Sequence, residues 1–108
     1  MTTSEDSRTP GFHVVAEYLL AEGTEEQVLA DIARLADASR AEPGNISYEY
    51  FRNVEQPDHV VIVERYVDED AFDAHLSSDH FQTIGTGEIT PRLRQRTVRT
   101  FSGTGQRS

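Results

Sequence analysis

The chain has 108 residues, a length typical of one domain with a single hydrophobic core. Nineteen acidic against ten basic residues give a formal net charge of −9 at pH 7, which argues against binding to nucleic acid or to an anionic membrane surface. The sequence contains no cysteine, which excludes disulfides and thiolate metal sites. It has no long apolar run and no basic and apolar leader, so we expect a soluble cytoplasmic protein.

Two segments biased in composition flank a central domain. Residues 1–10 and 102–108 are rich in Ser, Thr, Gly and charge, and we expect both to be disordered tails around a domain that spans residues 11–101. The first strand of this domain is expected over Phe12–Leu20. Both alternating sets of side chains in this strand contain apolar residues, so both of its faces are expected to be covered.

A helix and a hairpin follow the first strand. The capping-box pattern of Thr24–Gln27 predicts the helix start, and the helix is expected to end before Glu42-Pro43-Gly44. Its expected buried stripe consists of Val28, Leu29, Ile32, Leu35, Ala36 and Ser39. Alternation over Asn45–Arg52 predicts a half-buried strand, which a turn over Asn53–Asp58 connects to a third strand at His59–Val67. The third strand is apolar on both faces.

The last part of the chain predicts a second helix and a final strand. Asp68 is a suitable N-cap, and the helix places Phe72, His75, Leu76 and Asp79 on one side. A short helical piece with Phe81, Ile84 and Ile89 is expected next, weakened by Gly85 and Gly87. The final strand, roughly Arg94–Phe101, carries Arg94, Arg96 and Arg99. These arginines either grip an anionic substrate or form ion pairs with Glu17, Glu49 and Glu64.

The order of elements predicts an α+β fold of the ferredoxin-like type, βαββαβ, with a four-stranded antiparallel sheet. Two helices can cover only one face of such a sheet, yet the first and third strands are apolar on both faces. We therefore expect a homodimer in which the same face of a second copy covers the first, forming a dimeric α/β barrel.

The stretch from Glu64 to Phe81 contains Glu-x-aromatic, then Asp, then Ala-aromatic, then His-Leu-x-Ser-x-His-Phe. This pattern resembles the hallmark of the antibiotic biosynthesis monooxygenase (ABM) family, and the resemblance extends over about Phe12–Phe101, including Glu42-Pro43-Gly44. It implies the same dimeric α/β barrel. It also implies a small oxygenase without metal or flavin, which lets a deprotonated phenol, quinol or anthrone pass an electron to O2.

Such chemistry needs an apolar slot, a group that accepts a proton, and donors that hold an oxyanion. The expected catalytic residues are His75, Glu64 and Tyr66, with Glu64 and His75 as a hydrogen-bonded pair that raises the pKa of the histidine. The expected substrate-binding residues are Tyr18, Ile62, Phe72, His80 and Phe81. The alternative for His75 is a core histidine that bonds a backbone carbonyl, with Glu64 paired to Arg96, and for His80 it is a surface or cap position.

Several alternatives remain at the level of function. The histidines show no metal signature, because His75 and His80 are five residues apart and not four, and the sequence predicts no metal and no cofactor. The family's usual tryptophan is Tyr66 here, and positions that haem-degrading relatives require fall at Tyr18, His75 and near Gly85, which disfavours haem degradation. A non-catalytic dimeric ligand-binding or stress-associated protein, or an isomerase, could use the same fold.

Overall fold

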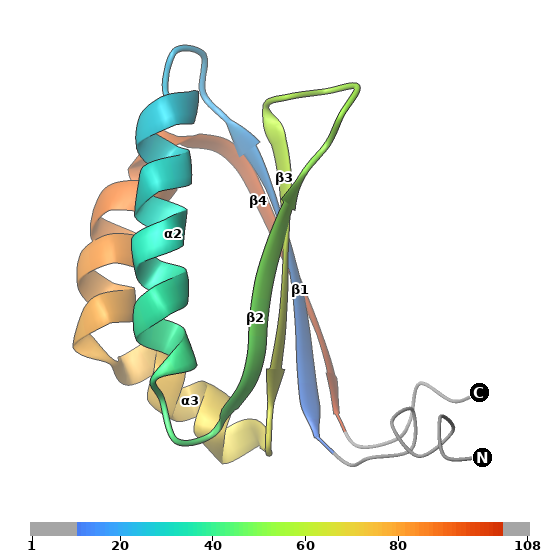
Figure 1. Ribbon diagram of the computed structural model, residues 1–108, viewed down its shortest axis with the longest axis vertical. Coiled ribbons are helices and arrows are strands. Elements are labelled where there is room, and N and C mark those ends of the chain that lie inside the picture. The colour runs from blue at the N-terminus through green and yellow to red at the C-terminus, as the bar shows by residue number, and fades with distance from the viewer. Residues whose placement is uncertain (1–10, 103–108) are drawn as a thin grey trace.

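The computed structural model describes residues 11–102, which form one sheet covered by helices on one side (Figure 1). The elements follow the order β1 (Phe12–Leu20), α2 (Glu25–Arg40), β2 (Asn45–Arg52), β3 (His59–Tyr66), α3 (Glu69–Ser77), the π-helix η1 (Phe81–Ile89), the 3-10 helix η2 (Thr90–Arg92) and β4 (Leu93–Ser102). This order confirms the expected ferredoxin-like α+β fold. The expected tails were 1–10 and 102–108, and residues 1–10 and 103–108 lie outside the described residues. The placement of Ser102 in a tail is wrong, because Ser102 is the last residue of β4.

The sheet has the strand order β2-β3-β1-β4 and is antiparallel throughout. Its register determines which side chains share the face under the helices. Glu64 of β3 pairs with Val14 of β1 on one side and with Tyr48 of β2 on the other. Arg96 of β4 pairs with Tyr18 of β1. Directly paired residues point to the same face, so these five side chains face the helices.

The hydrophobic core lies between this face and the helices, because every second residue of β1 and β3 is buried. The larger core cluster consists of Ala16, Tyr18, Leu20, Val28, Ile32, Leu35, Ala36, Tyr48, Val60, Ile62, Ile84 and Ile89. Figure 1 shows no described element against the other face of the sheet. Val15, Val63 and Phe101 line a shallow apolar groove on that face.

Of the two predicted N-cap hydrogen bonds, the structure contains the one at Asp68 and lacks the one at Thr24. The Asp68 carboxylate accepts a hydrogen bond from the Ala71 amide at 2.9 Å, which confirms the expected N-cap of α3. The capping box at Thr24 is wrong, because the Thr24 hydroxyl turns back and donates to the Ala21 carbonyl oxygen at 2.6 Å. The buried stripe of α2 also includes Asp31, which binds Gln27 and Arg34.

The helical piece expected after α3 is present, and its form is unusual. Nine residues from Phe81 to Ile89 form a π-helix that packs against α2. Gly85 is buried in it, and a Cβ at this position would lie 3.1 Å from Cδ1 of Phe81. The glycine therefore allows the Phe81 ring to lie close to the helix backbone. π-Helical segments are rare and occur frequently at functional sites.

Candidate functional site

A small cavity lies between the sheet and the start of the helical layer. Its apolar walls are Val14, Ala16, Phe72, Leu76, Phe81 and Val98, and its polar groups are Tyr18, Tyr48, Glu64, His75 and Arg96. The cavity has a volume of about 20 Å³, which is room for about one water molecule. An aromatic ligand could enter only if some of the aromatic and aliphatic walls moved aside. Ligand pockets of proteins usually have volumes of roughly 300–1,000 Å³, so this cavity has the mixed apolar and polar lining of a small-molecule site but not its size.

Glu64 supplies the carboxyl group of this cavity. The residue is 6% exposed, and its Oε1 accepts a hydrogen bond of 2.6 Å from the Tyr66 hydroxyl. Tyr66 is two residues further along β3, so both side chains project from the same face of the strand. The tyrosine is fully buried and contacts Phe72 of α3. The hydrogen bond therefore fixes the carboxyl group against a rigid aromatic wall.

Burial raises the pKa of Glu64 to about 7, because the cavity disfavours the charged carboxylate. The Tyr66 hydrogen bond and the Arg96 guanidinium favour the carboxylate and lower this pKa, whereas the nearby Glu42 raises it further. Burial and the Glu64 carboxylate raise the pKa of Tyr66 far above its ordinary value. At neutral pH Tyr66 is a hydrogen-bond donor, and Glu64 is poised between its acidic and basic forms.

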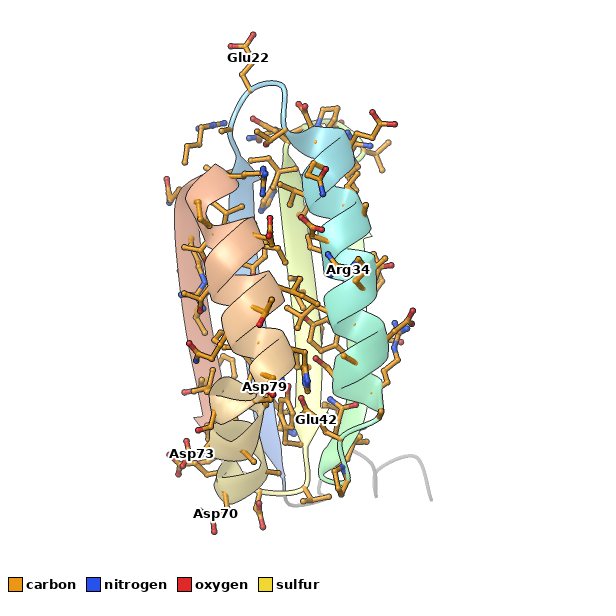
Figure 2. All side chains as sticks on the ribbon, turned by 90° about the vertical axis from the view of Figure 1, so that its left-hand side faces the viewer. Glu22, Arg34, Glu42, Asp70, Asp73 and Asp79 are labelled. Carbon is orange, nitrogen blue, oxygen red and sulfur yellow. The ribbon has the colours of Figure 1, made fainter. Side chains whose placement is uncertain are left out.

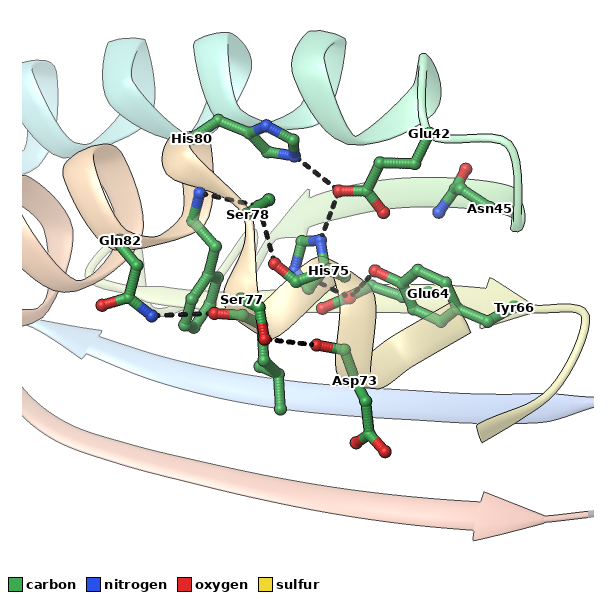
Figure 3. Close-up of polar contacts among 12 residues, drawn as sticks. Glu42, Asn45, Glu64, Tyr66, Asp73, His75, Ser77, Ser78, His80 and Gln82 are labelled. Atoms are coloured by element: carbon green, nitrogen blue, oxygen red, sulfur yellow. Dashed lines mark hydrogen bonds and ion pairs between the residues drawn. The ribbon is translucent and has the colours of Figure 1, made fainter. Parts of the chain in front are cut away.

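His75 contacts a second set of polar side chains, Glu42 and His80, on the side of its ring that faces away from Glu64. His75 Nδ1 lies 2.8 Å from Oε2 of Glu42, the residue after the C-cap of α2. The same Oε2 lies 2.5 Å from Nε2 of His80. Figure 3 shows the Glu42 carboxylate between the two imidazole rings. The cluster of Glu42, His75 and His80 places its ligand atoms within 4.8 Å of one another, so these residues could hold a metal ion.

The expected Glu64–His75 hydrogen bond is too long in the structure. His75 Nε2 lies 3.8 Å from Oε1 of Glu64, on the same side of the sheet but beyond hydrogen-bond distance. The expected rise in the histidine pKa is also wrong. Burial lowers the pKa of His75, and the hydrogen bond to Glu42 only partly offsets this effect. The pKa of Glu64 is therefore raised to about 7, whereas that of His75 is lowered from its ordinary value.

The structure brings most of the expected site residues together. Glu64, His75, Tyr18, Phe72 and Phe81 all line the cavity. Tyr66 lies behind Glu64, and His80 lies behind Glu42, so neither lines the cavity in this conformation. Ile62 is buried in the same core cluster as Ala16 and Tyr18, but it does not line the cavity.

Three polar residues of the site were missed or placed differently by the sequence analysis. The sequence pattern predicts Glu42 only as part of a helix stop and Tyr48 only as part of an alternating strand. The pairing of β2 with β3 places Tyr48 beside Glu64, and the hydrogen bond to His75 brings Glu42 to the site. Arg96 faces the cavity, whereas the neighbouring arginines form ion pairs, Arg99 with Glu17 at 2.7 Å and Arg94 with Asp58 at 2.6 Å.

Solved structures support the fold independently. A protein of Shewanella oneidensis, SO0527, is 32% identical, with a TM-score of 0.79 over 86% of this chain and 90% of that one. The crystal structure of an antibiotic biosynthesis monooxygenase is 27% identical, with a TM-score of 0.80 over 85% of this chain and 97% of that one. Among the described residues, no helix has the length and apolar character needed to cross a membrane.

Sequence comparison points to the same group of proteins. YcnE of Bacillus subtilis (strain 168) is 37% identical over 57 residues, which are 53% of this chain. The match spans 60% of the length of this curated relative. The family model described as antibiotic biosynthesis monooxygenase matches residues 11–86, which run from β1 into η1 and therefore include Glu42, Glu64, His75 and His80. The chain belongs to the antibiotic biosynthesis monooxygenase family.

Proposed function

We propose that this protein is a monooxygenase that oxidises a small phenol, quinol or anthrone-like substrate with O2, without a flavin or metal in the chemical step. The observation that carries the proposal is the Glu64 carboxyl group, buried in an apolar and aromatic cavity, held by Tyr66 and titrating near pH 7. A general base is most effective when its pKa lies near the working pH. Glu64 has this property, and it reaches the space where a ligand would lie.

The proposed reaction begins when the Glu64 carboxylate takes a proton from the substrate. The resulting electron-rich anion gives one electron to O2, and the two radicals combine to form a carbon–oxygen bond. The hydroperoxide then loses water. In an anthrone-like substrate, both hydrogens that are lost come from the reacting CH2 carbon, whereas in a phenol or quinol one comes from the ring carbon and one from a hydroxyl group. In either case one oxygen atom becomes a carbonyl on the reacting carbon, and the second oxygen atom leaves with the two hydrogens as water. The protein contributes the base, a cavity with apolar walls that the substrate would fill in place of water, and the orientation of the substrate.

Tyr18 and Arg96 are suited to hold the substrate oxygen. The Arg96 guanidinium is close enough to Tyr18 to lower the pKa of its hydroxyl, although burial is the larger effect and raises this pKa. Tyr18 therefore keeps its proton at neutral pH and can donate it in a hydrogen bond. A donor beside a positive charge stabilises a developing phenolate. Phe72 and Phe81 would enclose the flat faces of the ring, and His75 would form the wall beside Glu64.

The test is oxygen uptake with anthrone and with a hydroquinone, using protein that has been treated with a chelator. We expect uptake that depends on the protein, with one O2 consumed for each substrate molecule converted. Glu64→Gln keeps the size of the side chain and its acceptor for Tyr66 but removes the base. It should lower turnover by roughly 10²-fold or more, the usual scale for a lost general base.

The same variant also distinguishes lost chemistry from lost folding. The folded-state pKa of Glu64 is raised, so its contribution to stability is present below the unfolded-state pKa of about 4.5 and is lost as the pH rises through about 7. At pH 8, Glu64→Gln should therefore melt no lower than the parent protein. Full turnover in this variant contradicts Glu64 as the base. Binding of both probes without oxygen uptake favours a non-catalytic binding protein of this fold.

A further inference from the structure

Glu42, His75 and His80 form a cluster of one carboxylate and two imidazoles. The proposed oxidation gives this cluster no role. The three residues come from the end of α2, from α3 and from the turn before η1. Two imidazole nitrogens face one carboxylate, and the three ligand atoms lie within 4.8 Å of one another. Glu42 and His80 do not line the substrate cavity, and His75 faces the cluster with the ring nitrogen that points away from Glu64.

One oxygen of this cluster has no partner. Glu42 Oε1 is buried and makes no hydrogen bond within the described part of the chain. Glu42 Oε2, in contrast, is close to two nitrogens at once, at 2.8 Å and 2.5 Å. A buried carboxylate oxygen without a partner costs free energy. A cation between the carboxylate and the two rings would contact this carboxylate and compensate for the missing interaction.

We infer that Glu42, His75 and His80 form a binding site for one divalent transition-metal ion of the Zn²⁺ type. Two imidazoles and one carboxylate are ligands that Zn²⁺ and its neighbours in the first row accept, and Mg²⁺ prefers oxygen ligands. Ligand atoms around a tetrahedral zinc lie about 3.4 Å apart, given bonds of about 2.0–2.1 Å. The Glu42 oxygen therefore needs to withdraw by less than about 1 Å from each ring, or to present Oε1 in its place.

The surroundings of the cluster fit this assignment. When His75 Nδ1 binds a metal, the ring hydrogen resides on Nε2, which faces the Glu64 carboxyl at 3.8 Å. Metal-binding histidines usually donate their second ring hydrogen to a carboxylate or carbonyl. The Glu64 carboxyl lies on the side where this partner is expected, but it would have to approach Nε2 by more than about half an ångström to accept the hydrogen bond. The His80 side chain is 24% exposed and opens the cluster to solvent. Figure 2 shows Asp73 and Asp79 on the same end of the molecule as Glu42, and such acidic side chains attract cations.

Three protein ligands leave further coordination positions for water. The His75 ring separates the site from Glu64, and the inference therefore does not depend on the proposed oxidation. A bound ion would fix the end of α2 to α3, because its ligands come from both sides of that contact. This role is a conformational one, and it requires no redox change of the metal.

The experiment measures metal binding directly and involves no turnover. Full-length protein freed of metal with a chelator is titrated with Co²⁺ while visible absorption is recorded, and with Zn²⁺ by calorimetry. We expect one ion per chain, a Co²⁺ spectrum with imidazole coordination, and much weaker binding of Mg²⁺. Zn²⁺ should also raise the melting temperature, because it binds the folded state.

Variants of the cluster are compared with a matched histidine outside it. Glu42→Gln and His80→Ala should each weaken Zn²⁺ binding at least 10-fold and alter the Co²⁺ spectrum. His59→Ala is the control, because His59 also faces a carboxylate, Glu17, at 3.1 Å, but outside the cluster. It should bind like the parent protein. The inference is overturned if the parent protein gives no Co²⁺ spectrum at micromolar concentration, or if both cluster variants bind as tightly as the parent.

Discussion

Glu64 and Tyr66 lie two residues apart on β3, and their hydrogen bond is one of the interactions that set the pKa of the buried Glu64 carboxyl group. The spacing of two on β3 was sufficient to place both side chains on one face, and it could be read from the sequence. The pKa shift could not, because its main cause is burial beneath α3. Roughly 3 kcal/mol corresponds to a shift from the ordinary value to about 7. The folded protein carries this cost when Glu64 is charged, and such a shift is expected of a group with the proposed role of Glu64 as a base.

Tyr66→Phe tests how this carboxyl group is tuned. The variant removes the hydroxyl that favours the charged form of Glu64, so the pKa of Glu64 should rise above about 7. A carboxylate base works only when it is deprotonated, and turnover therefore increases with pH through its pKa. We expect the rising part of the pH–rate profile to move to higher pH by about one unit or more, the scale of a hydrogen bond to a charged group.

The measurement is the pH–rate profile of oxygen uptake by chelator-treated protein between pH 5 and about 9. Tyr50→Phe is the matched control, because Tyr50 is a partly buried tyrosine beside the same core and does not affect the pKa of Glu64. An unchanged profile in Tyr66→Phe would show that another group limits the rate. The remaining charged groups near Glu64 are Glu42 and Arg96, and both are the same in the two variants.

The strands could be predicted well from the sequence, and the helical layer less well. Alternating apolar residues define β1 and β3, and the observed bounds differ from the expected ones by no more than one residue. The helical piece at Phe81–Ile89 was predicted, but its π-helical form was not, because no local pattern of the sequence indicates this form and the segment packs against α2. The Glu42 cluster was missed for a related reason. Its contacts join residues 33 and 38 positions apart, which no local spacing reveals.

Gly44 controls the position of α3 relative to the loop after α2. A Cβ at Gly44 would lie 2.4 Å from the Cβ of Ala71, a distance that cannot be accommodated without movement of the helix. Gly44→Ala should therefore displace α3 and lower the free energy of unfolding by about 1–3 kcal/mol, the usual cost of overpacking. In a domain of this size, the melting temperature should fall by roughly 5–20 °C.

Thermal unfolding followed by circular dichroism provides the measurement. Gly87→Ala is the control, because its Cβ would meet only the Gln82 carbonyl oxygen at 3.4 Å, an ordinary contact. This control should change the melting temperature by a few degrees at most. A melting temperature of Gly44→Ala equal to that of the control would show that the loop yields easily and does not position α3.

The face of the sheet opposite the helices carries the prediction of a homodimer. Val15, Val63 and Phe101 line an apolar groove there, and Phe101 is 43% exposed in the single chain. Antiparallel sheets that face water usually show polar residues on the outer face. A second copy of the chain, related by two-fold symmetry, would cover this face with the same residues. In the predicted dimeric α/β barrel, the outer sheet face with Val15, Val63 and Phe101 packs against the same face of the second copy.

Light scattering during size-exclusion chromatography should give about twice the chain mass of 12.1 kDa. Val63→Asp places a charge in the expected interface and should dissociate the dimer, because an unpaired charge in an apolar interface costs several kcal/mol. Val54→Asp is the control. Val54 is 93% exposed in the loop after β2, so the same change there should leave the mass unchanged. A parent protein that elutes as a monomer would contradict the expected assembly.

The central position of β1 has a consequence for the order in which the molecule can form. Among the described strands β1 is synthesised first, yet both of its neighbours, β3 and β4, follow much later in the chain. The pairs reach from Phe12 to Ser102, and such distant contacts slow folding. Because Arg96 and Val98 arrive with β4, the cavity cannot close while this strand is still inside the ribosome. Until then, β1 has an unpaired edge that a chaperone or another nascent chain could bind.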